Sequence, residues 1–302
     1  MAKILVVGSI NMDLVVRVPH SPKPGETVLG GNFETFPGGK GANQAVAAAR
    51  MDGEVTMVGR VGSDDFGDSL IQGLVDDKVK TTHVIKDAKA ATGIAMIAVA
   101  ADGENLIVVA SGANMEVTVE DVLKTRDLMR DMDLLLLQLE NPIEVVSAAI
   151  DLAKAYNVPV VLNPAPAQSL SKTLLEKIDY LTPNETELMM LADEEDVEKG
   201  IQKIRKLGVQ NLVVTLGANG ARVISDGLDE HIPAHEITAV DTTAAGDAFN
   251  GALAVALAEG KPLIEAVGYG MAAGALAATK PGAQPSLPTR DEVENLLKAY
   301  KS

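Results

Sequence analysis

Two short segments rich in small residues place a charged side chain at the expected start of a helix. Residues 37–44 read Pro-Gly-Gly-Lys-Gly-Ala-Asn-Gln, and residues 241–249 read Asp-Thr-Thr-Ala-Ala-Gly-Asp-Ala-Phe. Small side chains let a ligand approach the backbone closely, and the free N–H groups at a helix start attract anions. Both segments therefore predict positions where an oxygen-rich ligand could bind.

The second segment could also hold a catalytic group. Thr242 and Thr243 are expected to cap the helix, and the small residues after them leave its first N–H groups accessible. Such an array can hold an anion whose charge grows during a reaction, and Asp247 in the same turn could act on a substrate hydroxyl. A well-capped helix with a stabilising acid is the alternative, although capping alone does not need so many small residues.

The first segment matches neither of the common nucleotide-binding loops. Lys40 is followed by Gly41 where a P-loop has Ser or Thr, and Gln44 stands where a dinucleotide fingerprint has its third glycine. A tight turn that leads into a helix explains this segment equally well when it is taken alone.

Further polar side chains follow the ends of predicted strands. Asn11 and Asp13 come after the apolar run 4–7, and Glu140 comes after the run 134–137. Ligands of open α/β sheets collect at the carboxyl ends of strands, and residues two apart in an extended chain share a face. These three side chains are therefore candidates for a binding site.

Two later segments also follow predicted strands. In residues 182–187, Asn184 fits a helix N-cap and Glu187 fits its capping-box partner. Residues 215–220, Thr-Leu-Gly-Ala-Asn-Gly, form a Gly-rich turn for which a simple hairpin is the plainest explanation. Neither segment alone indicates a function.

These residues are positioned by short apolar runs that alternate with longer helical patterns. Fully apolar runs separated by helices indicate buried parallel strands with helices on both faces, so the predicted fold class is α/β. The expected strands are 4–7, 56–58, 134–137, 158–162, 180–182 and 212–215, and the expected helices are 43–51, 66–77, 143–156, 195–207, 246–259, 262–279 and 289–300.

Two segments interrupt this alternation and offer no crossover helix. Residues 14–36 read as extended pieces around a Pro-rich turn, and residues 92–110 read as strands 94–100 and 105–110 joined by the hairpin signal Asp102-Gly103. We expect the two segments to form a small β lid. The body would consist of residues 1–13, 37–91 and 111–302.

Composition excludes several classes of function. The 302 residues include 26 Lys and Arg against 42 Asp and Glu, a net charge of −16, so nucleic acid and anionic membranes are not expected partners. The absence of cysteine excludes thiolate catalysis and disulfides. No apolar stretch approaches the ~20 residues of a membrane span, and no signal-peptide pattern is visible, so we expect a soluble cytoplasmic protein.

Taken together, the motifs resemble those of the ribokinase-like sugar kinases, the PfkB family of carbohydrate kinases. The resemblance covers nearly the whole chain, and the set of motifs in this order is specific although each one alone is weak. The matching motifs are residues 8–13, 38–43, 184–187, 215–220, 241–251 and 282–286. The family implies a three-layer α/β/α sandwich with a mostly parallel central sheet and a small β-sheet lid.

The resemblance implies that ATP and Mg²⁺ phosphorylate D-ribose at its 5-hydroxyl, which gives ribose 5-phosphate and ADP. Asp247 would accept the hydroxyl proton. The backbone of Ala244, Ala245, Gly246 and Asp247 would form the anion hole for the transferred phosphoryl group. The sugar would be bound by Asn11, Asp13, Gly38, Gly39, Lys40, Gly41, Asn43, Glu140 and Asp247.

The resemblance also implies a nucleotide site and a cation site. Asn184 would contact the nucleotide phosphates, and Glu187 would order water bound to Mg²⁺. The remaining ATP-binding residues would be Thr215, Leu216, Gly217, Ala218, Asn219, Gly220, Gly246 and Met271. A monovalent cation, usually potassium, would activate the enzyme from a site made by Asp241, Thr243, Ala277, Lys280, Gly282 and Ser286, mostly through backbone carbonyl oxygens.

Three further expectations follow from the family pattern. The lid would also pair two subunits into a homodimer. Met271 replaces an Asn or His that is common in relatives, which removes a polar contact to the nucleotide unless the thioether packs on the base. A kinase for deoxyribose, fructose or a nucleoside is the nearest alternative, and a non-catalytic sugar- or nucleotide-binding regulator is expected to lose Asp247 or Gly246, both of which are present.

Overall fold

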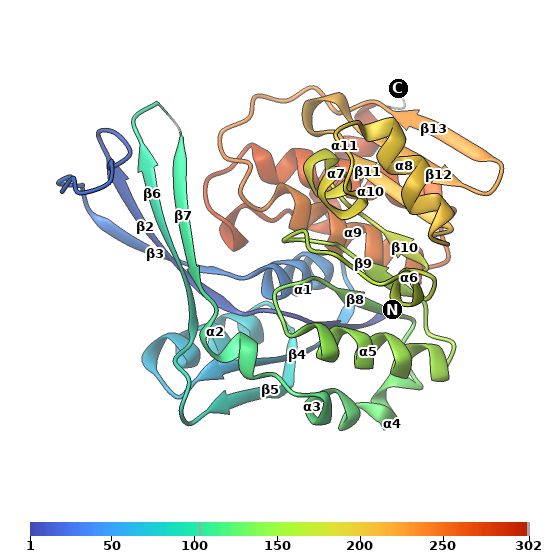
Figure 1. Ribbon diagram of the computed structural model, residues 1–302, viewed down its shortest axis with the longest axis horizontal. Helices are drawn as coiled ribbons and strands as arrows, with labels where there is room; N and C mark the ends of the chain where they lie inside the picture. The colour runs from blue at the N-terminus through green and yellow to red at the C-terminus, as the bar shows by residue number, and fades with distance from the viewer. Residues whose placement is uncertain (103, 301–302) are drawn as a thin grey trace.

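A nine-stranded sheet forms the centre of the computed structural model, which describes residues 1–102 and 104–300 (Figure 1). Its strand order is β13-β12-β11-β10-β9-β8-β1-β4-β5. The strands from β11 to β5 run parallel, and β12 pairs antiparallel with both β11 and β13. The strands are β1 (Lys3–Val7), β4 (Glu54–Gly62), β5 (Lys80–Asp87), β8 (Leu134–Leu137), β9 (Val160–Leu162), β10 (Tyr180–Leu181), β11 (Asn211–Thr215), β12 (Ala221–Ser225) and β13 (Leu228–Ile232).

Helices cover both faces of this sheet. The helices are α1 (Lys40–Arg50), α2 (Asp65–Asp76), α3 (Val119–Leu123), α4 (Arg126–Met129), α5 (Ile143–Ala155), α6 (Lys172–Leu175), α7 (Glu185–Ala192), α8 (Val197–Lys206), α9 (Ala245–Ala258), α10 (Leu263–Ala278) and α11 (Arg290–Ala299), with short 3₁₀ turns at Gly112–Glu116, Gly217–Asn219 and Gln284–Ser286. Helices α1, α2 and α9 to α11 share one apolar cluster, and α3 to α8 share another.

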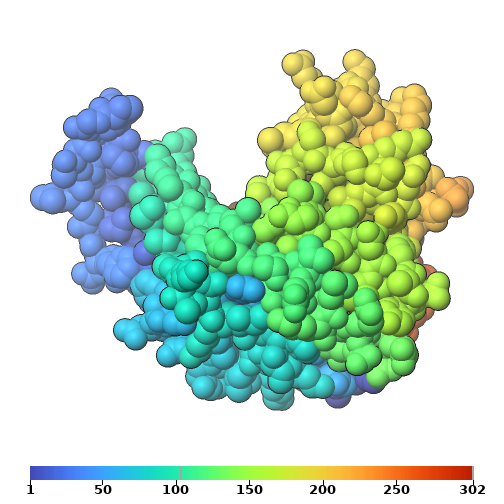
Figure 2. Space-filling view, turned by 60° about the horizontal axis from the view of Figure 1, so that its bottom comes forward, coloured from blue at the N-terminus to red at the C-terminus, as the bar shows by residue number. Residues whose placement is uncertain are grey.

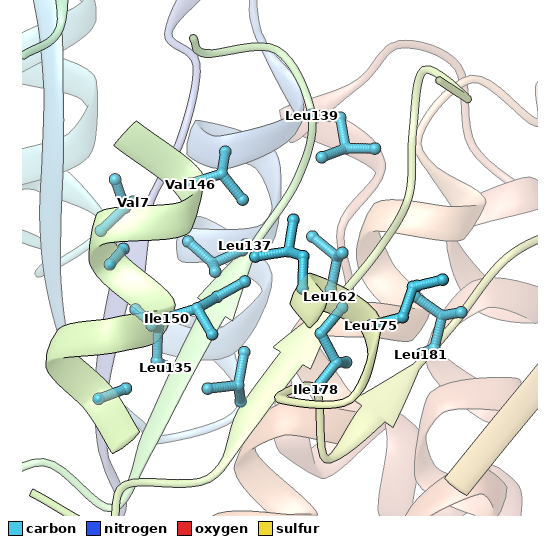
Figure 3. Close-up of a cluster of buried hydrophobic side chains, with 14 of the residues drawn as sticks. Val7, Leu135, Leu137, Leu139, Val146, Ile150, Leu162, Leu175, Ile178 and Leu181 are labelled. Atoms are coloured by element: carbon cyan, nitrogen blue, oxygen red, sulfur yellow. The ribbon is translucent and has the colours of Figure 1, made fainter. Parts of the chain in front are cut away.

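The two clusters meet at the sheet because alternate residues of a strand point to opposite sides. In β1, Ile4 and Val6 belong to the cluster with α1 and α9, whereas Leu5 and Val7 belong to the cluster with α5. Figure 3 shows part of the second cluster around Leu137. Each fully buried side chain of this size contributes about 1.5–3 kcal/mol. The predicted three-layer α/β/α sandwich is confirmed.

The sequence predicted most elements but missed three strands and the short helices α3, α4 and α6. The expected strand 134–137 coincides with β8, and the three expected C-terminal helices correspond to α9, α10 and α11. Strands β5, β12 and β13 were missed because they lie toward or at the sheet edges and mix polar with apolar residues, as in Leu228–Ile232. The helix expected at 43–51 already begins at Lys40. The sequence predicts a later start because Gly41 lowers the helix propensity of the first turn.

A four-stranded sheet in the order β3-β2-β6-β7 stands on this body. Its strands are β2 (Asn11–Val18), β3 (Phe33–Gly38), β6 (Gly93–Ala100) and β7 (Asn105–Ala110). The hairpin strands expected at 94–100 and 105–110 are therefore confirmed, while Gly103 of the predicted turn lies outside the described residues. Strand β2 already begins at Asn11 and β3 ends at Gly38, so this sheet, called the lid below, starts within the predicted sugar-binding motifs.

The lid and the body enclose an open groove. Figure 2 shows the two parts rising on either side of it. A cleft of about 800 Å³ lies between lid residues such as Asp13 and Ile97 and the body loops at 239–243 and 281–283. Among the described residues, no helix is both long and apolar enough to cross a membrane.

Candidate active site

The predicted site residues at the strand ends meet at one edge of the sheet, around the start of α1. Lys40 N donates to Glu140 Oε2 at 3.1 Å, and Ser9 Oγ donates to the same carboxyl. Gly41 N donates to Ser9 Oγ at 3.3 Å. The acid that follows β8 is thus fixed against the turn that follows β1 and against the helix start.

Two glycines make this close packing possible. Gly39 is the N-cap of α1 with φ 88°, and a Cβ there would lie 2.7 Å from the backbone N of Asn11. A Cβ at Gly38 would lie 2.4 Å from the carboxyl of Asp13. The glycines of the first motif therefore bring the sugar-site candidates Asn11 and Asp13 directly against α1.

The two candidates on β2 are buried and differ in their partners. Asn11 Oδ1 accepts from Asn114 Nδ2 at 2.6 Å, and Asn114 Oδ1 accepts from Ile10 N at 2.8 Å, so the Asn11 amide is held in one orientation. Asp13 is 8% exposed. Burial, together with the nearby carboxyl groups of Glu140 and Asp247, raises the pKa of Asp13 to about 7, against the opposing effect of Lys40.

The start of α9 has no side-chain cap among the described residues, so the prediction that Thr242 and Thr243 cap this helix is wrong. Ala244 is the N-cap residue. The helix begins at Ala245, so Thr242 and Thr243 lie before the N-cap position. Asp241 Oδ1 accepts from both the backbone N and the hydroxyl of Thr243, which holds this residue in the preceding loop.

The missing cap leaves backbone donors available. Ala245 N donates to Thr242 O at 3.2 Å, but the N–H groups of Gly246 and Asp247 have no acceptor among the described residues. A Cβ at Gly246 would meet no atom within 4 Å, so the space in front of this turn is open. Free N–H groups and the helix dipole favour an anion at this position.

Asp247 lies in this turn and is 6% exposed. Its Oδ2 accepts from Asn43 Nδ2 at 2.9 Å and its Oδ1 accepts from Gln44 Nε2 at 3.0 Å. Burial raises the pKa of Asp247 above its ordinary value, and Lys40, Asn43 and Gln44 act against that rise. The start of α1 therefore supplies both the donors and the positive charge that accompany this carboxyl group.

Lys40 is the cation of the site. Burial disfavours its charge, but the carboxyl groups of Asp247 and Glu140, followed by those of Glu187 and Asp13, hold the pKa of Lys40 above its ordinary value. The ammonium group thus lies among four acids from four separate segments. It offers a fixed positive charge between the α9 start and the α7 start.

The nucleotide-site candidates lie on the α7 side. Asn184 caps α7 and Glu187 completes the predicted capping box, with Glu187 N to Asn184 Oδ1 at 2.8 Å and Asn184 N to Glu187 Oε2 at 2.9 Å. Burial raises the pKa of Glu187, and the hydrogen bond from Asn184 opposes that rise. Asn184 pairs with Thr215 in an isolated β-bridge, which brings the 215–220 turn next to α7.

The 215–220 turn joins antiparallel β11 and β12, so the hairpin explanation of its geometry is correct. Gly217 and Gly220 both adopt positive φ, 56° and 99°. Met271 is 8% exposed and packs in an apolar cluster with Phe249 and Val213. In this structure its thioether therefore belongs to the core at the base of the hairpin.

The cation-site candidates are brought together by Asp241. Its Oδ2 accepts from Gly282 N at 2.9 Å, and its backbone N donates to Ala278 O at 3.2 Å, which joins the loop before α9 to the loop after α10. Ala277 O accepts from Lys280 N, and Lys280 Nζ pairs with Glu292 at 2.9 Å. Ser286 is buried and donates to Ala283 O at 2.8 Å.

The donor set of these loops suits a monovalent cation. The backbone carbonyl oxygens of Asp241, Thr243, Lys280 and Gly282 accept no hydrogen bond from the described residues. Carbonyl oxygens are ligands that hard cations prefer. Four of the six positions that the family resemblance implies for potassium therefore offer a carbonyl oxygen that is free among the described residues, whereas Ala277 O already accepts from Lys280 N.

The chain is similar to known proteins over nearly its whole length. The family model described as "pfkB family carbohydrate kinase" matches residues 1–290. The chain belongs to the pfkB family of carbohydrate kinases. The kinase is 44% identical over 297 residues to a ribokinase of Haemophilus influenzae, with 97% of each chain covered, and 36% identical to a deoxyribokinase of Salmonella typhimurium, with 97% and 98% covered.

Solved structures agree with this placement. The kinase matches the ribokinase of Thermotoga maritima with a TM-score of 0.91 and 43% identity over 99% of this chain and 100% of that one. It matches an Arabidopsis thaliana ribokinase complexed with ribose and ATP with a TM-score of 0.89 and 35% identity over 99% of both chains.

Sequence reasoning about the kinase missed residues that orient the site without belonging to a recognisable chemical pattern. Asn114 holds Asn11, and Gln44 contacts Asp247. Arg50 Nη1 donates to the carbonyls of Gln284 and Leu287 at 2.8 and 2.9 Å, which fixes the loop that contains Ser286. A polar residue in the middle of an otherwise apolar helix face, as at Gln44, was the available signal.

Proposed function

We propose that this kinase transfers the γ-phosphoryl group of ATP to the 5-hydroxyl of D-ribose. The observation that carries the proposal is the uncapped start of α9, where free N–H groups lie beside the buried Asp247 and the ammonium of Lys40. Phosphoryl transfer depends on positioning and on neutralising charge, and this arrangement supplies both.

In the proposed reaction Asp247 takes the proton of the sugar hydroxyl as its oxygen attacks the γ-phosphorus. The bond from the γ-phosphorus to the β,γ-bridging oxygen breaks, ADP leaves, and the proton remains on Asp247 until it passes to solvent. The backbone of residues 244–247 stabilises the charge on the transferred group. Among the described residues, the N–H groups of Gly246 and Asp247 have no acceptor and could bind the phosphoryl group. The N–H group of Ala245 already donates to Thr242 O.

The sugar lies, in this proposal, between the lid root and the start of α1. Its ligands are Asn11, Asp13, Gly38, Gly39, Lys40, Gly41, Asn43 and Glu140. Asn43 supports this role, because its Nδ2 donates to Asp247 while its buried Oδ1 has no hydrogen-bond partner among the described residues. A buried acceptor without a partner is costly, and a sugar hydroxyl would satisfy it.

ATP lies on the α7 side in this proposal, with Asn184 at the phosphates and the turn 215–220 along the nucleotide. Mg²⁺, when bound, would neutralise the charge of the phosphates, and Glu187 would hold its water ligands. The capping box keeps the Glu187 carboxyl in a fixed place. Potassium would bind at the carbonyl oxygens of the loops joined by Asp241 and would stabilise the adjoining start of α9.

The principal alternative is a kinase of the same family for deoxyribose, fructose or a nucleoside. The deoxyribokinase relative keeps that alternative open at 36% identity, whereas the ribokinase relative reaches 44%. Asn11 and Asp13 both face the site and suit a sugar with vicinal hydroxyls. Aromatic residues make up only 3% of the chain, which leaves little surface to stack a nucleoside base.

A sugar panel tests the proposal. ADP release is measured with ribose, deoxyribose, fructose and adenosine, each with and without potassium. We expect the highest kcat/KM with ribose and a further increase with potassium. A higher kcat/KM for deoxyribose, fructose or adenosine than for ribose would refute the substrate assignment.

A further inference from the structure

Gln44 lies directly behind Asp247 on the buried face of α1 and is fully buried. Its Nε2 donates to Asp247 Oδ1 at 3.0 Å and to Asn163 Oδ1 at 3.1 Å. Its Oε1 accepts from Gln138 Nε2 at 2.6 Å. The side chain touches neither the cleft nor any of the proposed substrate ligands except Asp247, so the proposed function gives it no role of its own.

The orientation of this amide follows from a backbone carbonyl. Asn163 Nδ2 donates to Thr182 O at 3.0 Å. Because a carbonyl oxygen can only accept, the Asn163 amide must present its oxygen to Gln44. Gln44 must then present its NH₂ group, and the second hydrogen of that group points to Asp247.

The same constraint acts on the protonation state of Asp247. A carboxylate accepts from both Asn43 and Gln44, one hydrogen bond at each oxygen. In a protonated carboxyl the hydroxyl oxygen is a much weaker acceptor, so protonation weakens the hydrogen bond from Asn43 or from Gln44. Gln44 cannot turn to accept the new proton, because its oxygen would then face the oxygen of Asn163. A buried mismatch of this kind is costly.

We propose that Gln44 is a positioning residue for the transfer reaction, which holds Asp247 in its acceptor form through the buried chain from Thr182 by way of Asn163. This inference rests on the proposed function of Asp247 as the base. It explains how a carboxyl group removed from solvent is ready to accept a proton at neutral pH.

Other charged groups also face Asp247. Lys40 comes from α1, Glu140 follows β8, Asp13 comes from β2 and Glu187 comes from α7. A change at Gln44 leaves all four in place, so its effect on Asp247 is separable from theirs.

The experiment measures the titration of Asp247 directly, by NMR of the ¹³C-labelled aspartate carboxyls in the unliganded protein. The Asp247 resonance is identified by its loss in Asp247→Asn. Gln44→Met removes the donor and keeps the volume, and we expect the midpoint of Asp247 to rise by about one pH unit. The acidic limb of the plot of kcat against pH should also move to higher pH. An unchanged Asp247 midpoint in folded Gln44→Met would overturn the inference.

Gln72→Met is the matched control, because Gln72 Nε2 also donates to an aspartate, Asp76, but at an exposed position on α2. It should leave Asp247 unchanged. If Gln44→Met does not fold, Gln44→Glu is used instead, because it keeps the shape of the side chain. Its added carboxyl should raise the pH midpoint of the Asp247 titration above that of the wild-type protein. An unchanged midpoint in this variant refutes the proposal. A rise without any sugar kinase activity would reject the proposed function and leave the effect of Gln44 on Asp247 standing.

Discussion

Asp13 and Asp247 are two buried carboxyl groups that differ in their hydrogen bonds. Both lie near Lys40 and Glu140, but Asp247 also accepts from the amides of Asn43 and Gln44. Burial raises the pKa of both groups, and the two amides oppose that rise at Asp247, whereas burial and two neighbouring acids raise the pKa of Asp13 to about 7. Asp13 belongs to the proposed sugar ligands.

Asp13 makes the stability of the unliganded enzyme depend on pH. In the unfolded chain its pKa is near 3.8 and in the folded protein it is about 7, so the folded state holds more protons between these values. Stability therefore falls as pH rises from about 4 to about 7. We expect Asp13→Asn to raise the free energy of unfolding by about 1–3 kcal/mol at pH 8 and by little at pH 4, as measured by urea denaturation.

The same variant should bind ribose more weakly, because it loses a charged acceptor worth about 1.5–3 kcal/mol. Calorimetric titration with ribose at pH 8 measures this loss. A variant that is both less stable at pH 8 and unchanged in ribose affinity would contradict the assignment of Asp13.

Asp247→Asn tests the base. The substitution keeps the size of the side chain but removes its ability to take a proton, so kcat should fall about 10²–10⁴-fold while ribose affinity changes little. Single-turnover phosphorylation by quenched flow measures the chemical step. Turnover close to that of the wild-type enzyme would exclude Asp247 as the base.

At the residue scale the sequence was informative where chemistry and position coincide. Asn11, Asp13 and Asp247 could be predicted because each follows a strand or opens a helix. The free start of α9 could not be predicted in its actual form, because Thr243 is a good capping residue and only the fold shows that the N-cap position falls on Ala244.

At the scale of elements, the starts of α1 and α9 determine the site. The N-cap residues, Gly39 for α1 and Ala244 for α9, make no side-chain hydrogen bond to their helices among the described residues. Capping would add about 1 kcal/mol to each helix. In α9 the N–H groups of Gly246 and Asp247 find no acceptor among the described residues, and the proposed function explains why. In α1 the first N–H groups instead donate to Glu140 and Ser9 and so fix the sugar side of the site.

Gly246→Ala separates folding from function at the start of α9. An added Cβ meets no atom of the protein within 4 Å, and alanine is favoured over glycine in a helix by about 0.5–1 kcal/mol. We therefore expect an equal or higher melting temperature together with at least a tenfold lower kcat/KM, because the methyl group enters the space in front of the free N–H groups.

Gly268→Ala on α10 provides the comparison, since a Cβ there also meets no atom within 4 Å. It should match the melting temperature of Gly246→Ala and keep full activity. Full activity in Gly246→Ala as well would argue against an anion at this helix start.

Most elements could be predicted because the central body strands, such as β8, are mostly apolar and most of the helices around them are long. The short helices α3, α4 and α6 were missed because four or five residues carry too little periodicity. The strands that were missed, such as β5 and β13, are partly exposed, so their hydrophobic pattern is weak. The parallel pairing of β2 with β6 joins segments about eighty residues apart, and no local pattern encodes such a contact.

At the scale of the whole molecule, the lid leaves an apolar surface open. Met96, Leu106 and Val108 are 46%, 43% and 49% exposed and lie on the face of β6 and β7 away from the cleft, whereas Ile107 lines the cleft. An exposed apolar edge strand invites association. We propose that a second copy of the chain covers this face, in agreement with the homodimer expected from the sequence.

Val108→Lys should therefore shift the enzyme toward a monomer in light scattering coupled to size-exclusion chromatography. Ile107→Lys places the same charge one residue away on the cleft face and should keep the mass of the dimer. A wild-type enzyme that runs as a monomer, or a Val108→Lys variant that remains dimeric, would refute this interface.

The lid is joined to the body by four strand ends, not by a single hinge. Strand β2 enters from β1, β3 leaves into α1, β6 enters after β5 and β7 leaves toward α3. At this root Asn11 pairs with both Gly38 and Gly93. The lid is consequently not a transferable module, since cutting it out would remove ligands of the proposed sugar site. Engineering a new sugar preference by exchanging lids between relatives would require the exchanged piece to include these root residues and the start of α1.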